Sequence, residues 1–380
     1  MRAVGVMSGT SLDGVDVAVV DLRGEGWNTR ARLVAFSSKP YPRKVREAIL
    51  AVSNRTCHTA EIARLNVWLA EHYAERVIAT CSAHGIRQKS IGVVGCHGQT
   101  IFHESEPVRF LGRATASTLQ IGDGSFLAER LGITVVHDFR MRDMAAGGKG
   151  APLVPYLDYL LFRHRTRGRV ALNLGGIGNI TAIPGGAESP DETFAFDTGP
   201  GNMVMDQLAA LATGGRASFD LDARIGRKGK LNQGLLDELM KDRYLAAAPP
   251  KTAGREQYGQ EFIARLRATG LPLADLMHTA AAFTARSVAA AVDRFVRPRF
   301  TPRDLVAAGG GVHNPLLMAY LSAFLPDLKI TTTAEHGIDP DAKEAVAFAV
   351  LAAESIHLRP SNLTSATGAR HRVILGKINP

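Results

Sequence analysis

The stretch that decides the fold is 2-RAVGVMSGTSLDGVDVAVVD-21, in which two β-rich runs flank the turn 8-SGTSLDG-14. A strand, a turn of Gly, Ser, Thr and Asp, and a returning strand predict a hairpin. A second stretch in the other half of the chain, 170-VALNLGGIGNITAI-183, has the same pattern. Two glycine-rich hairpins of this kind, one in each half, indicate a duplicated domain.

The segments between and after the hairpins alternate between strand and helix patterns. The stretch 91-IGVVGCHGQT-100 predicts a buried strand that ends in a polar loop, and 305-LVAAGG-310 predicts another strand. Apolar residues at helical spacing predict a helix over 203–212 and a long core helix over 276–295. This alternation is typical of an α/β protein with mostly buried sheets.

The composition narrows the classes of protein to which the chain can belong. With 46% hydrophobic and 21% charged residues among 380, the chain is globular and long enough for two domains. Its 38 glycines gather in clusters without a three-residue period, which excludes collagen and indicates sites built from bare backbone. Cys57, Cys81 and Cys96 have no CxxC spacing, so we expect no disulfide scaffold or structural zinc and a reducing cytoplasm.

The net charge of +9 raises the question of a nucleic-acid partner. The densest basic segments, 163-RHRTRGR-169 and 294-RFVRPRFTPR-303, lie between apolar segments and carry no RNA- or DNA-binding motif. No run approaches 18 apolar residues, and the N-terminal apolar run is too short for a signal peptide. We therefore expect no nucleic-acid partner and no membrane segment, and a charge suited to small anionic substrates.

Three glycine-rich turns follow apolar strands, at 9-GTSLDG-14, 175-GGIG-178 and 309-GGG-311. Glycines let the backbone approach a ligand closely, and Thr10 and Ser11 offer hydroxyls and amides to phosphate oxygens. Neither a Walker A motif nor a GxGxxG motif is present. Each turn alone is explained equally well as a plain connection. Together they favour a nucleotide held between two domains.

Carboxylates beside these turns and at strand ends are candidates for proton transfer or Mg²⁺ binding. A single Asp beside Gly is more often a turn or cap residue. Asp197 stands out because it ends a strand and precedes the constrained turn 198-TGPGN-202. The sequence has no HExxH, His/Cys cluster or GxSxG, so we expect neither a protein-held transition metal nor a serine hydrolase. The candidate acids are Asp13, Asp138, Asp143, Asp197 and Glu344.

The two hairpins and the GGG turn resemble the actin/Hsp70/sugar-kinase superfamily. That resemblance implies an α/β fold of two ribonuclease H-like domains with an interdomain cleft. More narrowly, the chain resembles the anhydro-N-acetylmuramic acid kinase family from residue 5 to beyond Ala347. The motifs that carry the resemblance are 7-MSGTSLDGVD-16, 97-HGQTIFH-103, 137-HDFRMRDMAAGGKGAPLVP-155, 173-NLGGIGN-179, 196-FDTGPGN-202, 251-KTAGRE-256 and 309-GGG-311.

The resemblance implies a bacterial cytoplasmic enzyme of peptidoglycan recycling and amino-sugar catabolism, and a homodimer. Such an enzyme uses ATP and Mg²⁺ to convert 1,6-anhydro-N-acetylmuramic acid into N-acetylmuramic acid 6-phosphate and ADP. Water opens the anhydro bridge at C1 while O6 receives the γ-phosphoryl group. The family's catalytic base matches Asp197, and the Glu that helps to orient the water matches Glu344.

The resemblance also assigns ligand contacts. Expected nucleotide contacts are Gly9, Thr10, Ser11, Leu12, Asp13, Gly14, Val15, Asp16, Gly175, Gly176, Gly309, Gly310 and Gly311. Expected sugar contacts are His97, Thr100, Arg140 and Asp143. Lys149 departs from the family's usual Gln and adds a cation beside the expected cleft. We expect one domain over 1–138 plus 352–380 and a second over 139–351, with closure around the substrates.

Two alternatives stay open at this point. Another sugar or carboxylate kinase of the superfamily would use the same turns, but it leaves the FDTGPGN and GAPLVP segments unexplained. An ATP-driven module like Hsp70 would need an added partner-binding domain, and two core domains leave little of the 380 residues for one.

Overall fold

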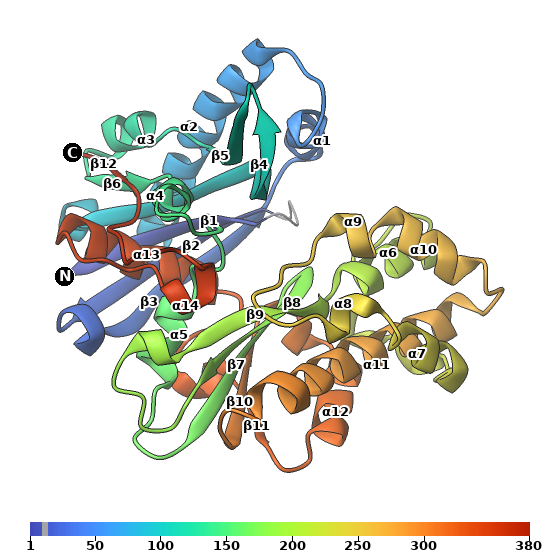
Figure 1. Cartoon of the computed structure of the whole chain (residues 1–380). Helices are drawn as coiled ribbons and strands as arrows, with labels where there is room; N and C mark the ends of the chain where they lie inside the picture. The colour runs from blue at the N-terminus through green and yellow to red at the C-terminus, as the bar shows by residue number, and fades with distance from the viewer. Residues whose placement is uncertain (10–13) are drawn as a thin grey trace. The chain divides into compact units, whose positions relative to one another are not determined.

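The chain forms two units, each built around one sheet, in the computed structural model of Figure 1. The structure describes residues 1–9 and 14–380, apart from the side chains of residues 255 and 256. The first unit comprises residues 1–161 and 337–380, and the second comprises residues 162–336.

These units differ from the predicted domains, 1–138 plus 352–380 and 139–351, at both junctions. The segments 139–161 and 337–351 belong to the first unit. A buried contact explains the difference, because the Lys343 ammonium donates to the Asp158 carboxylate at 3.1 Å and both side chains are almost fully enclosed. This pair ties the start of the C-terminal helix to the preceding part of the same unit.

The first unit has a seven-stranded sheet of order β12-β6-β4-β1-β2-β3, from which β5 extends as a partner of β4. Strands β1 and β2 form the predicted antiparallel hairpin, in which Val4 lies opposite Val19. Strands β1, β4 and β6 run parallel to one another. The strands are β1 (Arg2–Ser8), β2 (Gly14–Arg23), β3 (Arg30–Pro40), β4 (Val93–Phe110), β5 (Arg113–Ile121), β6 (Val135–His137) and β12 (Lys377–Asn379).

Helices cover both faces of this sheet. Because side chains alternate along a strand, Val4 and Val6 of β1 join a core with Tyr73 of α2, while the residues between them face α13. Figure 1 shows α13 in front of the sheet and α2 behind it. The helices of this unit are α1 (Arg43–Val52), α2 (Thr59–Ala83), α3 (Gly124–Leu131), α4 (Phe139–Ala145), α5 (Pro155–Phe162), α13 (Lys343–Ile356) and α14 (Thr364–Thr367).

Two paired glycines let α13 lie directly on the sheet. Gly5 of β1 is opposite Gly95 of β4 in the parallel register. A Cβ at Gly5 would lie 1.7 Å from the Ala345 carbonyl oxygen, and one at Gly95 would lie 2.1 Å from the Phe348 carbonyl oxygen. Both contacts are with helix backbone, which has no rotamer by which to withdraw. The absence of two side chains therefore sets the position of α13.

The second unit has a five-stranded sheet of order β11-β10-β7-β8-β9. Strands β7 and β8 form the second predicted hairpin, and β7, β10 and β11 are parallel. Read from β9, the strands of this sheet are the third, second, first, fourth and fifth of the unit in the chain. With β5 left out, β3-β2-β1-β4-β6 of the first unit has the same order. This confirms the duplicated α/β fold. The strands are β7 (Gly168–Leu174), β8 (Ile177–Ile183), β9 (Phe194–Pro200), β10 (Pro302–Ala308) and β11 (Lys329–Thr332).

The core of the second unit is centred on α11. This helix buries Leu276, Ala280, Phe283 and Val288 against Leu172 and Phe196 of the sheet and the neighbouring helices. Helix α6 has the predicted bounds of 203 and 212. The helices are α6 (Met203–Ala212), α7 (Gln233–Leu239), α8 (Arg243–Ala246), α9 (Arg255–Tyr258), α10 (Gln260–Arg267), α11 (Leu273–Ala291) and α12 (Pro315–Phe324).

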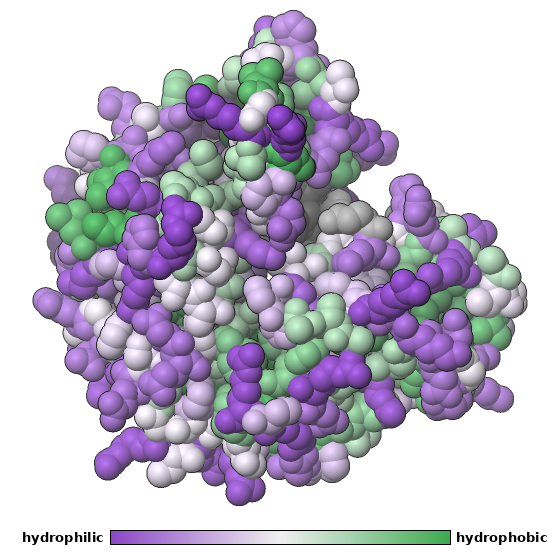
Figure 2. All heavy atoms as spheres, viewed as in Figure 1, coloured by the Kyte–Doolittle hydropathy of each residue, from purple (hydrophilic) through white to green (hydrophobic). Residues whose placement is uncertain are grey.

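Hydrophilic residues predominate on the face shown in Figure 2, and hydrophobic residues form separate groups on it. Among the described residues, no helix combines the length and apolar character that a bilayer crossing requires. The apolar side chains of each unit are mostly enclosed between its sheet and its helices.

The contact between Gly5 and α13 predicts the effect of a single methyl group. We expect Gly5→Ala to lower the free energy of unfolding by roughly 3 kcal/mol, because the helix backbone must move to admit the Cβ. Gly234→Ala is the matched control, since a Cβ there meets nothing closer than 3.6 Å and alanine favours a helix. Urea unfolding followed by circular dichroism measures both; a Gly5→Ala midpoint equal to that of the unaltered chain would contradict the packing argument.

Candidate active site

Three glycine-containing turns of the second unit meet at one end of its sheet. The turn after β7 contains Gly175 and Gly176, Gly199 and Gly201 flank the last residue of β9, and Gly309–Gly311 follows β10. The Gly201 amide donates to the Gly176 carbonyl at 2.9 Å, and the Asn202 amide donates to the Gly175 carbonyl at 2.7 Å. These bonds join the second predicted nucleotide turn to the turn after β9. The GGG turn lies against both, because a Cβ at Gly311 would lie 2.5 Å from the Leu174 Cβ and 3.0 Å from Asn202 Oδ1.

Packing demands some of these glycines and leaves others unexplained. A Cβ at Gly201 would lie 2.1 Å from the Gly175 carbonyl oxygen, and one at Gly311 would lie 2.5 Å from the Leu174 Cβ. At Gly175 and Gly310, however, a Cβ would meet nothing closer than 3.8 and 3.6 Å. Packing therefore does not require glycine at these two positions, where the backbone is bare.

Asp197 lies in β9 beside these turns. Its Oδ2 accepts a hydrogen bond from the Ala253 amide at 2.8 Å, and its own amide donates to the Lys251 carbonyl at 3.2 Å. Burial raises the pKa of the Asp197 carboxyl to about 7, although the Ala253 amide and the Lys251 charge act in the opposite direction. A carboxyl that titrates near neutral pH suits a general base.

The first glycine-rich turn lies in the first unit and is described only at its ends. Thr10, Ser11, Leu12 and Asp13, predicted as nucleotide contacts, lie outside the described residues. Gly9 precedes that gap, and Gly14, Val15 and Asp16 follow it as the start of β2. A Cβ at Gly14 would lie 2.1 Å from the Lys39 carbonyl oxygen, so packing against β3 requires this glycine.

Sequence reasoning did not single out Gln99, which holds the start of this turn. Its buried side chain accepts from the Ser8 hydroxyl at 2.6 Å and donates to the Gly9 carbonyl at 3.3 Å. The Ser8 hydroxyl also bonds to the Tyr41 hydroxyl at 2.8 Å. Gln99 lies between two predicted sugar contacts in the quoted motif 97-HGQT-100, which was the available signal.

His97, Arg140 and Glu344 form an electrostatic cluster in the first unit. His97 Nε2 accepts from Arg140 Nε at 3.0 Å, while its Nδ1 lies 2.7 Å from the Gly98 carbonyl oxygen. Burial and the Arg140 charge lower the pKa of His97 to about 3, so its imidazole is neutral at pH 7. Burial also lowers the pKa of Arg140 to about 10, and the carboxylates of Glu344 and Asp143 oppose this effect. Arg140 therefore stays charged, held by a neutral histidine.

The other predicted sugar contacts take part in internal hydrogen bonds. Asp143 is fully enclosed and accepts from the Gly150 amide at 2.8 Å, Asn362 Nδ2 at 2.8 Å and the Thr367 hydroxyl at 2.7 Å. These bonds are those of a residue that fixes the loop before Gly150. The partly buried Thr100 hydroxyl accepts from Gln120 Nε2 at 3.2 Å.

The cation at Lys149 is paired within the first unit. Its ammonium lies 2.7 Å from Glu106 Oε1 on β4, and its amide donates to the Thr367 carbonyl at 2.8 Å. The positive charge that Lys149 adds, relative to the family's usual Gln, is therefore paired with the Glu106 carboxylate. Asp138, the other candidate acid in this region, pairs with Lys377 at 2.7 Å.

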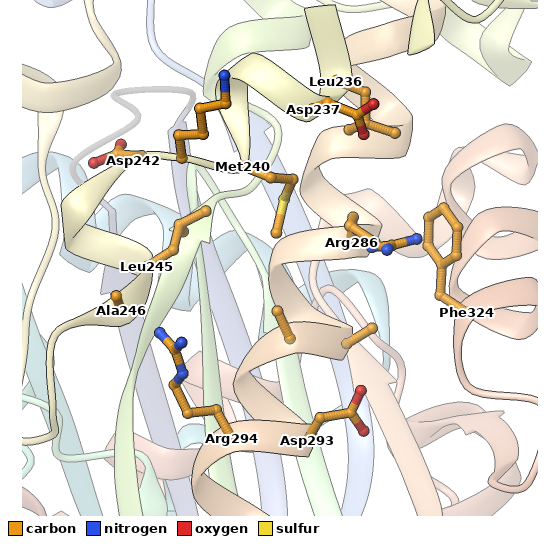
Figure 3. Close-up of a pocket in the computed structure, with 13 residues that line it drawn as sticks. Leu236, Asp237, Met240, Asp242, Leu245, Ala246, Arg286, Asp293, Arg294 and Phe324 are labelled. Carbon is orange, nitrogen blue, oxygen red and sulfur yellow. The ribbon is translucent and has the colours of Figure 1, made fainter. Parts of the chain in front are cut away.

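A separate pocket of about 900 Å³ in the second unit lies among α7, α8, α11 and α12. Figure 3 shows its side chains, and Arg286 extends toward the ring of Phe324, with 5.1 Å between guanidinium and ring centroid. None of the predicted site residues lines it. It adjoins the Asp197 region through Leu245, whose Cδ2 would lie 3.2 Å from a Cβ at Gly199.

The predicted site residues therefore divide between the units. Gly175, Gly176, Asp197 and Gly309–Gly311 gather in the second unit. His97, Arg140 and Glu344 gather in the first, where Asp143 and Thr100 also lie. Lys251, which neighbours Asp197, is a further residue of the site that sequence reasoning left unassigned, although the motif 251-KTAGRE-256 contained it.

Comparison with known proteins identifies the family. The family model described as anhydro-N-acetylmuramic acid kinase matches residues 1–380. Anhydro-N-acetylmuramic acid kinases of Caldanaerobacter subterraneus subsp. tengcongensis and Salinibacter ruber are each 42% identical over 99% of this chain and 96% and 95% of their own lengths. A ROK family glucokinase from Streptomyces griseus, solved with glucose and AMPPNP, aligns at 13% identity and a TM-score of 0.39 over 93% of this chain and all of that chain. The match over the whole sequence places the chain in the anhydro-N-acetylmuramic acid kinase family.

Proposed function

We propose that this protein uses ATP to convert 1,6-anhydro-N-acetylmuramic acid into N-acetylmuramic acid 6-phosphate and ADP, in peptidoglycan recycling and amino-sugar catabolism. The observation that carries the proposal is the family match over residues 1–380. The raised pKa of Asp197, beside turns of exposed glycine backbone, supports it at the level of chemistry. Another sugar or carboxylate kinase is the alternative, and the family match weighs against it.

In the proposed reaction two bond changes are coupled. Water attacks C1 of the sugar and Asp197 accepts its proton, while the bond from C1 to the bridging oxygen breaks. The electron pair of that bond goes to the bridging oxygen, which becomes O6 and attacks the γ-phosphorus, and ADP leaves. The phosphoryl group thus captures the charge that would make the bridging oxygen a poor leaving group. Glu344 is proposed to orient the water.

The glycine turns are proposed to hold the nucleotide. Gly175, Gly176 and Gly309–Gly311 offer backbone amides and flat surface to the nucleotide, and residues 9–16 of the first unit are proposed to contact its phosphates. Mg²⁺, when bound with ATP, would neutralise phosphate charge. Asp16 suits it, because a partly exposed carboxylate directly after the first turn is the oxygen ligand that Mg²⁺ prefers.

His97, Arg140, Thr100 and Asp143 are proposed to serve the sugar. Arg140 is the charged member, and an arginine held in place by a neutral histidine is suited to a carboxylate such as that of the lactyl group. Asp143 would act by fixing the loop whose Gly150 carbonyl accepts from Arg140 at 2.7 Å. We further propose that the protein works in the cytoplasm, where ATP is available, and as a homodimer.

The reaction predicts a specific product. With ATP, Mg²⁺, 1,6-anhydro-N-acetylmuramic acid and ¹⁸O-labelled water, we expect a ring-opened sugar 6-phosphate that carries the label at C1, detected by mass spectrometry. Asp197→Asn should reduce turnover by at least about 10³-fold, because the water loses its base, while nucleotide affinity stays within about threefold. A phosphorylated sugar with an intact anhydro bridge would overturn the coupled reaction, and retained turnover in Asp197→Asn would remove Asp197 as the base.

The raised pKa of Asp197 predicts the pH dependence. The carboxyl must be ionised to accept a proton, so kcat/KM should rise with pH, bend near pH 7 and then level off. At pH values more than one unit below the bend, kcat/KM should fall about tenfold for each further unit by which the pH is lowered. Steady-state rates between pH 5 and 9 measure this, with each buffer checked for stability of the fold. Rates that stay level down to pH 5, as a carboxyl with the ordinary Asp pKa of 3.8 would give, would contradict a raised pKa of Asp197 in this step.

A further inference from the structure

We propose that Lys251 is a positioning residue for Asp197: it holds the segment 251–254 along β9 and, through its charge, favours the ionised carboxylate at the pH where the enzyme works. The proposal rests on the role of Asp197 as the base. Lys251 would not touch the substrates. It would act only through the position and ionisation of Asp197.

Lys251 is buried to an unusual degree for a lysine, with 7% of the residue exposed. Its Nζ donates to the Tyr244 carbonyl at 3.0 Å and the Leu245 carbonyl at 3.2 Å, both in α8. The rings of Phe196, Tyr244 and Phe295 have their centroids 5.7, 4.7 and 5.0 Å from the same atom. Carbonyl oxygens and ring faces, rather than an ion pair within the described part of the chain, thus stabilise its charge.

Two hydrogen bonds join the segment that begins at Lys251 to Asp197. The Asp197 amide donates to the Lys251 carbonyl at 3.2 Å, and two residues later the Ala253 amide donates to Asp197 Oδ2 at 2.8 Å. The Tyr244 hydroxyl donates to the Asp197 carbonyl at 2.9 Å. Lys251 therefore links three pieces, β9, α8 and its own segment. Loss of its ammonium would loosen the segment whose Ala253 amide donates to the Asp197 carboxylate.

The charges around Lys251 fix the direction of its effect. Burial lowers the pKa of Lys251 to about 8, Arg294 acts the same way, and the carboxylates of Asp197 and Asp242 oppose them. Lys251 is therefore largely charged at pH 7, where Asp197 titrates. Around Asp197 itself, the Lys251 charge and the Ala253 amide favour the ionised form, and burial disfavours it. Asp242 and Arg294 line the pocket of Figure 3, on which neither Lys251 nor Asp197 borders.

Removal of the charge should therefore make Asp197 harder to ionise. In Lys251→Met, which keeps the aliphatic packing, we expect the acidic limb of kcat/KM to move to higher pH by about one unit. Turnover at pH 6 should then fall about tenfold further than turnover at pH 9. In Lys251→Arg the acidic limb of kcat/KM should stay at the pH of the unaltered chain, because arginine keeps the positive charge. Lys241→Met is the matched control. Lys241 is an exposed lysine that lines the neighbouring pocket and pairs with Glu238.

A direct titration of the Asp197 carboxyl separates this proposal from the proposed function. Carboxyl ¹³C NMR resonances, with the Asp197 signal assigned by its loss in Asp197→Asn, report the ionisation whether or not the protein turns over sugar. The signal should titrate at higher pH in Lys251→Met than in the unaltered chain and in Lys241→Met. If the titration shifts in this way but the unaltered chain shows no kinase activity, the proposed function fails and the role of Lys251 in the ionisation of Asp197 stands.

Other outcomes would overturn the proposal. An unchanged Asp197 titration in folded Lys251→Met, or an equal loss of turnover at all pH values that Lys251→Arg does not restore, would leave Lys251 with a purely structural role. If Lys251→Met does not fold, Lys251→Gln replaces it, because the amide still donates to the α8 carbonyls but carries no charge. The same shift in titration is then required of Lys251→Gln.

Discussion

The contact on which the first unit depends is the close approach of α13 to the bare backbone of Gly5 and Gly95. Helix α13 can lie this close to the sheet only because both positions are glycine, since a side chain at Gly5 or Gly95 would collide with the helix backbone. Glu344 lies in the first turn of this helix, and the Phe348 ring of the same helix lies 4.8 Å, centroid to centroid, from the His97 ring. The absence of side chains at Gly5 and Gly95 thus helps to fix the positions of His97, Arg140 and Glu344.

The repeated strand order gives the end of the first strand the same neighbour in each unit. In both sheets the first and fourth strands are parallel neighbours, so the end of the first strand lies beside the fourth strand. In the first unit Gln99 reaches from the fourth strand to Gly9. In the second unit the turn at Gly309–Gly311 packs on Leu174. The same scaffold therefore supports a polar side chain in one unit and bare backbone in the other.

Local patterns predicted the hairpins and the helix over 203–212, because turn chemistry and apolar periodicity act over a few residues. Long-range packing determined what they did not predict. The polar loop predicted at the end of 91–100 is wrong: strand β4 continues through these residues to Phe110, because β5 pairs with it. The apolar helix α13 does not encode which sheet it covers; Gly5 and Gly95 decide that from far away in the sequence. Lys251 was overlooked because a lysine in a loop gives no sign of burial.

The division of the first unit into two chain segments sets an order of events during synthesis. Residues 162–336 are contiguous and hold their own sheet and core, so that unit can fold while the rest of the chain is still being made. The first unit lacks α13 and β12 until residues 337–380 have been synthesised, and until then Gly5 and Gly95 face no helix. The strands of residues 1–161 are thus made early, but the sheet that they form is covered on its α13 face only late.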